Sequence, residues 1–247
     1  STEYLADLTR GLGKRASVHR NGLSRWMIDA SHTIIEERRR CGRRDKTIVG
    51  YGSGTATHRK DLAQAAPALA QVMGRHEHVE LHIVGPLHIG EPLALPECLK
   101  EFGDRVRHLP LVGWREWLQV LGGFDINLAP LEADNPYCLA KSEIKHTEGA
   151  VIGLPTVASR TAAFEHAIRD GETGFLAGSD AEWVAALEQL IGDPALRTTI
   201  GDAARADVLD RYAPSALGKE LVRTLETAQE VTVRRYASVA VESDPDD

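Results

Sequence analysis

The sequence predicts an α/β domain whose central parallel sheet is doubly wound, with helices on both faces. Short β-branched or aliphatic runs alternate with longer amphipathic stretches, which is the pattern of repeated βα units. The chain has 247 residues, of which 43% are hydrophobic and 26% charged, as in an ordinary globular protein with room for one large domain. No window approaches the roughly 20 unbroken apolar residues that a membrane helix needs.

Strands and helices are expected to alternate between residues 46 and 212. The expected strands are residues 47–51, 79–84, 106–110, 124–129, 156–158 and 174–176. The expected helices are residues 61–75, 114–121, 142–152, 181–191 and 194–212. Proline at the first turn of the last helix fits this assignment, because its missing N–H is not needed there. These elements predict a single doubly wound domain over residues 46–212.

Residues 1–45 have a different character and do not form a domain by themselves. They combine a helical pattern at 3–12, an extended piece at 17–20, an Asn-Gly turn signal and a helix that ends in an arginine run at 38–40. The basic run suits an anionic partner, but basic residues in the last turn of a helix also simply complement its dipole. Both interpretations stay open.

The C-terminal end is expected to hold one more helix, at 213–237. Residues 238–247 follow as an acidic tail that is too polar to fold. At the other end the chain starts at Ser1 instead of a methionine, so we expect it to be processed or cut from a longer protein.

Charge and cysteine content exclude several classes of function. A net charge of −7 argues against a general nucleic-acid surface. The three cysteines, Cys41, Cys98 and Cys138, are isolated and odd in number, which excludes a disulfide framework and a C-x-x-C metal or redox pair. The G-x-S-x-G elbow of serine hydrolases is absent. Because no secretory signal is visible either, we expect a cytoplasmic protein.

A metal site is not expected. Four of the ten histidines lie close together in the sequence. They are His76, His78, His82 and His88. They straddle a helix end, a strand and a loop, without the supporting cysteine or acid pairs of a metal site. We therefore expect no metal and no other cofactor.

The first expected strand leads into a glycine-rich loop, GYGSGTATHRK, at residues 50–60. Its candidate ligand-binding residues are Gly50, Gly52, Ser53, Gly54, Thr55, Arg59 and Lys60. Alternate glycines let the backbone approach a ligand, hydroxyls add donors, and a basic helix start favours negative charge. The loop matches neither a Walker A motif nor a dinucleotide fingerprint. A phosphate site and a strand-to-helix turn without ligand both fit this pattern.

A second candidate region reads KSEIKHTE at residues 141–148. At 100° per residue, Lys141, Lys145 and Glu148 fall on one helical stripe, with Ser142 as a possible cap. Two lysines four residues apart repel each other and lie at the wrong end of a helix dipole, and an anion would relieve both. Lysine and helix N-terminal amides can hold a diphosphate, and Glu148 can accept hydrogen bonds from ribose hydroxyls. The alternative is a solvated face with a Lys145–Glu148 pair.

Two further blocks resemble the group 1 glycosyltransferases, also called glycosyltransferase family four. Residues 148–159 read EGAVIGLPTVAS, similar to the family's E-A-x-x-x-G-x-P-V-V-A-S, and residues 170–176 read DGETGFL, similar to x-D-G-x-T-G-x-L. Residues 17–23, SVHRNGL, look like the family's V-x-P-N-G linker. The resemblance implies that residues 46–212 form the Rossmann-like C-terminal half of a GT-B fold, which binds the donor. It also implies that residues 1–45 are the end of the N-terminal half and the linker.

The same resemblance implies a retaining hexosyltransferase that uses a nucleotide-sugar donor. Helix dipoles and basic side chains then replace a metal in stabilising the departing diphosphate. Glu148 matches the second glutamate of the family's E-x7-E pair, which implies contacts with the ribose hydroxyls, and residues 50–54 match its phosphate-facing loop. Tyr51 stands where many members carry arginine. The implied catalytic candidates are Lys60, Lys141, Lys145 and Glu148.

The sequence departs from the family at the first glutamate of that pair. Its position holds Ala140, and Glu143 is out of register, although a subset of the family reads K-S-E-x-K-x-x-E, as residues 141–148 do. The amides after the strand at 156–158 are expected to face the same cleft. The remaining donor-site candidates are Ser142, Glu143 and Thr161.

Two functions follow from this resemblance. The first is a glycosyltransferase whose acceptor, a glycan, lipid or protein, binds to a missing N-terminal half, so that this fragment holds the donor and is inactive alone. The second is a non-catalytic nucleotide-binding or interaction module of GT-B type, for which Ala140 is the supporting observation. Neither involves nucleic acid.

Overall fold

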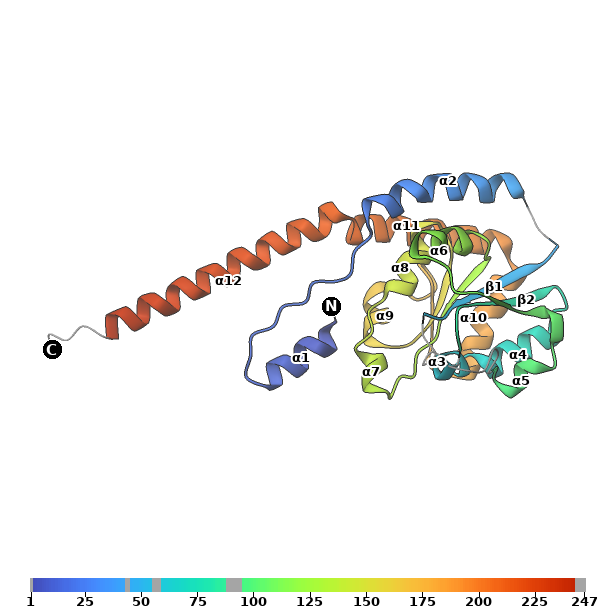
Figure 1. The fold of residues 1–247 in the computed structure, drawn as a ribbon, viewed down its shortest axis with the longest axis horizontal. Coiled ribbons are helices and arrows are strands. Elements are labelled where there is room, and N and C mark those ends of the chain that lie inside the picture. The colour runs from blue at the N-terminus through green and yellow to red at the C-terminus, as the bar shows by residue number, and fades with distance from the viewer. Residues whose placement is uncertain (1, 43–44, 55–58, 88–94, 243–247) are drawn as a thin grey trace.

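The computed structural model describes residues 2–42, 45–54, 59–87 and 95–242 (Figure 1). Within them, a parallel sheet of six strands forms the centre of the molecule, in the order β3-β2-β1-β4-β5-β6. The strands are β1 (Thr47–Gly52), β2 (Val79–Val84), β3 (Val106–Leu109), β4 (Ile126–Ala129), β5 (Thr156–Ser159) and β6 (Phe175–Ala177). All six lie where the sequence predicts strands, within two residues at either end. The doubly wound α/β fold is confirmed.

Helices cover both faces of the sheet, as Figure 1 shows. The larger ones are α2 (Arg25–Cys41), α4 (Ala66–Arg75), α6 (Trp114–Gly122), α8 (Ile144–Val151), α10 (Asp180–Gly192) and α11 (Pro194–Tyr212). Short helices lie between them: α3 (Arg59–Ala63), α5 (Glu97–Lys100), a 3-10 turn (Gly103–Arg105), α7 (Pro136–Leu139) and α9 (Ala162–Ala167). Two further helices lie at the ends of the chain, α1 (Glu3–Gly11) and α12 (Pro214–Glu242).

Two hydrophobic cores result, one on each face of the sheet. On one face, residues of α4 and α10 pack against Val49, Leu81 and Leu128. On the other face, residues of α2, α6, α8 and α11 pack around Phe124 and Ala129. Burial on both faces explains why the strands read as short continuous apolar runs without polar alternation.

The helix expected at 61–75 is in fact two helices, α3 and α4. Pro67 lies in the first turn of α4. Because proline has no N–H, it cannot donate to the carbonyl of residue 63, and a continuous helix breaks there. The amides of Gln64 and Ala65 instead close short turns onto Asp61 and Leu62, at 3.1 Å each.

Two other expected boundaries are wrong. Helix α8 begins at Ile144 instead of residue 142, with Glu143 at the N-cap position, so Ser142 does not cap it. Helix α12 continues to Glu242, so residues 238–242 of the expected acidic tail are helical; residues 230–242 contain no glycine or proline that would end the helix. Residues 243–247 lie outside the described part of the chain.

The N-terminal segment is attached to the domain at several points. The Leu23 amide donates to the Tyr212 carbonyl at the end of α11, at 2.9 Å, and Leu23 itself is buried. In the last turn of α2, the Arg38 guanidinium donates to the Gly122 carbonyl at 2.8 Å and to the Phe124 carbonyl. Arg38 therefore ties α2 to the end of α6, a structural role for the first arginine of the basic run. Figure 1 shows α12 projecting away from the domain and α1 lying beside it.

Close packing of α11 on the turn after α8 generates a prediction. A Cβ placed on Gly201 would lie 2.1 Å from the Gly153 carbonyl oxygen. We expect Gly201→Ala to lower the free energy of unfolding by about 1–3 kcal/mol, because the backbone must shift. Gly74→Ala in α4 is the control, since its Cβ meets nothing within 4 Å and alanine favours a helix by up to about 1 kcal/mol. Urea unfolding curves measure both; equal stabilities would contradict the packing argument.

Candidate functional site

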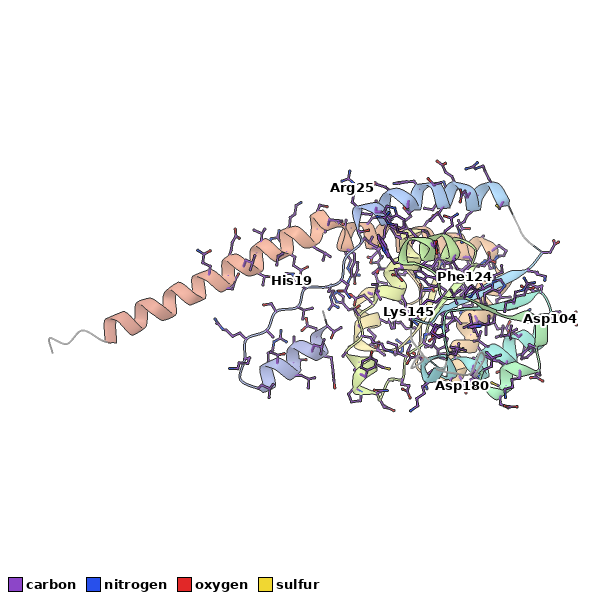
Figure 2. The ribbon with its side chains drawn as sticks, in the orientation of Figure 1. His19, Arg25, Asp104, Phe124, Lys145 and Asp180 are labelled. Carbon is purple, nitrogen blue, oxygen red and sulfur yellow. The ribbon has the colours of Figure 1, made fainter. Side chains whose placement is uncertain are left out.

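The strand order reverses between β1 and β4, so the carboxyl ends of these two strands form the switch point of the sheet. Open α/β sheets bind ligands in the crevice at this point. Lys145, from α8, lies at this edge, on the side turned toward the segment that carries His19 (Figure 2). Asp104, which precedes β3, lies at the opposite end of the domain.

Helix α8 is fixed to the sheet by a polar side chain of β4. The Asn127 amide group donates to the Lys145 backbone carbonyl at 2.8 Å and to the Thr156 hydroxyl of β5 at 3.2 Å. Gly149 lets the helix come this close, because a Cβ there would lie 3.0 Å from the Asn127 nitrogen. The buried Asn127 amide therefore fixes the position of α8, and with it the positions from which its side chains extend.

Lys145 reaches from α8 to the end of β1. Its ammonium group donates to the Gly52 carbonyl at 2.9 Å and lies 4.2 Å from the centre of the Tyr51 ring. Burial lowers the pKa of Lys145 to about 8, while the charge of Asp61 opposes this change and that of Lys141 adds to it. Its proton is therefore held less firmly than that of an ordinary surface lysine.

Lys141 lies in the segment between α7 and α8 and pairs with a residue far away in the sequence. Its ammonium group lies 2.7 Å from Oδ2 of Asp61, whose side chain is only 2% exposed. The Cys138 thiol donates to Oδ1 of the same carboxylate at 3.2 Å. Lys141 also lies 5.1 Å from the centre of the exposed Tyr137 ring. A protein carboxylate thus already relieves part of the repulsion that the sequence predicted between the two lysines.

Glu148 accepts a hydrogen bond from the indole N–H of Trp117 on α6, at 2.9 Å. Burial raises the pKa of the Glu148 carboxyl, and the indole N–H and the charge of Lys145 offset part of that rise. The Trp117–Glu148 hydrogen bond takes the place of the Lys145–Glu148 pair, which the sequence left open as an alternative. The solvated-face interpretation of residues 141–148 is wrong, because Lys145 and Glu148 are both partly buried and bonded.

The glycines of the first strand differ from expectation. A Cβ on Gly50 would lie 1.8 Å from the Phe124 ring, and one on Gly52 would lie 2.6 Å from the Trp117 ring. Gly50 therefore allows close packing inside the domain, and its role in ligand binding stays a prediction. Gly52 does reach the site through its carbonyl group.

The remaining residues of the glycine-rich loop are only partly described. Ser53 is buried, and its hydroxyl donates to the Pro86 carbonyl. Gly54 and Lys60 are exposed. Arg59 begins α3, but its side chain is not among those that the structure describes. Thr55 lies outside the described residues altogether. The phosphate-binding role of this loop stays a prediction.

Ser142 and Glu143 bond to other parts of the domain and not to the cluster around Lys145. The Ser142 hydroxyl accepts a hydrogen bond from the Asn21 amide group at 2.8 Å. Glu143 is buried, and its Oε1 accepts from the Arg20 guanidinium at 3.2 Å and from the Tyr212 hydroxyl at 2.9 Å. Both residues therefore hold the linker-like segment 17–23 against the start of α8.

Thr161 lies directly after β5, at the N-cap position of α9. It is 4% exposed, and its hydroxyl oxygen has no hydrogen-bond partner among the described residues. Its predicted role in donor binding stays a prediction.

In the described part of the chain, the histidines do not come together as a set of metal ligands. His76 bonds to Glu188 at 2.6 Å and His82 to Glu80 at 3.0 Å, at separate places, and His88 lies outside the described residues. Ligand atoms of Asp61, Glu132 and Cys138 do lie within 4.8 Å of one another. We assign no metal there, because the Lys141 ammonium group already contacts the Asp61 carboxylate.

Three residues of the site were missed at the sequence level: Asp61, Trp117 and Asn127. Asn127 carried a signal, since a polar residue inside a buried apolar strand needs a partner. Asp61 and Trp117 read as ordinary positions of amphipathic helices. Their partners, Lys141 and Glu148, are 80 and 31 residues away in the chain.

The family model described as "Glycosyl transferases group 1" matches residues 45–193. The chain belongs to this family. It is 29% identical over 171 residues to a phosphatidyl-myo-inositol mannosyltransferase of Mycobacterium leprae, which covers 68% of this chain and 43% of that protein. It is 30% identical over 143 residues to a D-inositol 3-phosphate glycosyltransferase of an Arthrobacter species, covering 56% of this chain and 32% of that protein. The chain thus spans less than half the length of these relatives.

Solved structures of similar fold confirm the Rossmann-like α/β fold of this group 1 glycosyltransferase domain, which matches structures of GT-B glycosyltransferases. Anabaena HepE in complex with UDP-glucose superposes with a TM-score of 0.68 at 20% identity, covering 92% of this chain and 62% of that one. The C-terminal domain of a group 1 glycosyltransferase, LpcC of Francisella tularensis, superposes with a TM-score of 0.56 at 16% identity, covering 80% and 97% respectively. In the described residues, no helix has both the length and the apolar character needed to cross a membrane.

Helix α8 carries a further titratable residue, His146, in the interior of the domain. The residue is 0% exposed, and neither ring nitrogen has a hydrogen-bond partner among the described residues. Burial lowers the pKa of His146 to about 4; Asp207 and Arg211 of α11 act on it in opposite directions. The folded domain therefore holds this histidine neutral.

This burial predicts acid sensitivity. Between pH 6.5 and 4 the unfolded chain binds a proton at His146 that the folded chain does not, so stability falls as the pH falls through this range. We expect the wild type to lose about 2 kcal/mol more than His146→Leu between pH 7 and pH 4.5. Urea unfolding at both pH values measures this difference. The exposed His32→Gln variant is the control, and an equal loss in His146→Leu and wild type would refute the assignment.

Proposed function

We propose that this chain is the donor-binding, C-terminal part of a retaining glycosyltransferase of hexosyltransferase type that uses a nucleotide sugar. The observation that carries the proposal is the convergence of Lys141, Lys145 and Glu148 at the switch point of the sheet. The family and its relatives, named as a mannosyltransferase and a glycosyltransferase, support it. The similar fold of HepE, solved with UDP-glucose, agrees with a nucleotide-sugar donor.

In this proposal the basic side chains act on the diphosphate. Lys141, Lys145 and Lys60 supply positive charge, together with the loop after β1 and the start of α9 at Thr161. Charge that develops on the leaving diphosphate is then stabilised without a metal or another cofactor. Glu148, held by Trp117, accepts hydrogen bonds from the ribose hydroxyls.

The acceptor is proposed to bind outside this chain. The chain spans 43% and 32% of the two relatives and 62% of HepE, which leaves room for a second, N-terminal half in such proteins. A glycan, lipid or protein acceptor would enter between the halves, in the biosynthesis of a polysaccharide or glycoconjugate. The proposal includes a cytoplasmic location and no nucleic-acid partner.

One observation favours a second candidate, a non-catalytic nucleotide-binding module. Ala140 stands at the expected place of the first glutamate, and the nearby carboxylate of Glu143 is bonded to Arg20 and Tyr212. Transfer and donor-hydrolysis assays distinguish the candidates, using a chain that also carries an N-terminal half. Binding without any turnover would favour the module.

Donor binding is tested through Glu148. We expect Glu148→Ala to weaken binding of UDP, GDP or ADP, whichever binds the wild type, about ten- to a hundredfold, because hydrogen bonds to a charged group are lost. Isothermal titration calorimetry measures the affinity. Glu77→Ala is the matched control, since Glu77 is exposed and lies two residues before β2, at the opposite edge of the sheet. Unchanged affinity in Glu148→Ala would remove the ribose assignment.

A further inference from the structure

Asp61 is a buried carboxylate at the centre of the lysine cluster, and the donor-binding proposal has given it no role. It is 1% exposed, in the short helix α3. One oxygen accepts from the Lys141 ammonium group at 2.7 Å and the other from the Cys138 thiol at 3.2 Å. Burying a charge is costly unless it is paired and hydrogen-bonded, and both oxygens meet that requirement here.

Stability is a weak explanation for this arrangement. A buried ion pair adds little net stability compared with apolar residues of similar volume, because desolvation offsets the attraction. Removing one partner of such a pair is destabilising. Replacing both partners by apolar residues of similar volume, in contrast, leaves a fold about as stable. The pair therefore points to a requirement of the site itself.

Lys145 faces charged or titratable groups from several elements. These groups are Tyr51 of β1, Asp61 of α3, Cys138 of α7, Lys141 before α8 and Glu148 of α8. Of the neighbouring charges that raise the pKa of Lys145, the carboxylate of Asp61 has the largest effect. The positive charge of Lys141 lowers that pKa. Asp61 thus acts on both lysines, one by direct contact and one through its charge.

We propose that Asp61 is a positioning residue of the donor site, which supplies the negative charge against which Lys141 and Lys145 are held until a diphosphate enters. This inference rests on the proposed function. Lys141, with a side chain 21% exposed, turns part of its charge to the ligand when it binds. The Cys138 thiol keeps one Asp61 oxygen hydrogen-bonded throughout.

The decisive variant is Asp61→Asn in the 247-residue chain, with UDP as the probe. Apart from the effect of UDP ionisation, wild-type affinity should be constant below about pH 8 and fall above it, as Lys145 loses its proton. In Asp61→Asn this fall should move to lower pH by about one unit, with roughly tenfold weaker binding at pH 8. The ionisation of UDP itself is common to all variants and cancels in the comparison.

A second readout follows Lys145 without any ligand. Carbon-13 NMR of the lysine side chains, with Lys145→Arg for assignment, should give a pKa of about 8 in the wild type and a lower value in Asp61→Asn. Glu97→Gln is the matched control. It removes the acid of an exposed pair, with Lys100, in which Glu97 is 87% exposed, and it should change neither readout.

Each outcome decides one question. If the wild type binds no nucleoside diphosphate, the proposed function fails, while the NMR titration still tests Asp61. If Asp61→Asn keeps the wild-type pH midpoint and Lys145 pKa, the inference is overturned. Asp61→Ala serves as a second neutral variant. If neither neutral variant folds, Asp61 is required by the fold and the proposal falls as well.

Discussion

The site depends on one buried amide, Asn127 of β4, which bonds at once to the backbone of α8 and to β5. An unpaired polar group at that depth would cost stability, so the helix and the two strands keep one relative position. Gly149 permits that approach. With α8 fixed over the sheet edge, Lys145 reaches the last carbonyl of β1 and Glu148 reaches Trp117. The reach of the Lys145 and Glu148 side chains follows from the same contact.

The charges that act on the site are those of a few neighbouring residues, and the net charge of −7 has little influence there. Lys141 and Lys145 both lie near the start of α8, where the helix dipole favours negative charge. The buried carboxylate of Asp61 offsets this, because it contacts Lys141 directly and acts on Lys145 through its charge. Burial also weakens the hold of Lys145 on its proton. The protein thus supplies a counter-charge to these lysines itself.

Periodicity predicted the sheet and the large helices because each is a local pattern that burial on two faces reinforces. The division of 61–75 into α3 and α4 was readable from Pro67, whose missing N–H is a local fact. The site was predictable only in part. Lys145 and Glu148 follow from helical spacing, whereas the pairs Lys141–Asp61 and Trp117–Glu148 join separate elements and have no signature in a single sequence. Gly50 has a packing role that the sequence did not reveal, since the lack of a side chain there makes room for the Phe124 ring.

The departure from the family pattern at Ala140 is accompanied by a contact with the N-terminal segment. Glu143 lies three residues after the position of the first glutamate, and its carboxylate accepts from Arg20 at 3.2 Å, with the Tyr212 hydroxyl on the same oxygen. A carboxylate bonded in this way has its charge compensated by an arginine that is itself largely buried. Its other oxygen, Oε2, has no hydrogen-bond partner among the described residues but is buried, out of reach of a ligand in solution. Under the proposed function, recognition of the donor sugar then falls to backbone groups or to a second half, and the same ion pair holds residues 17–23 against the start of α8.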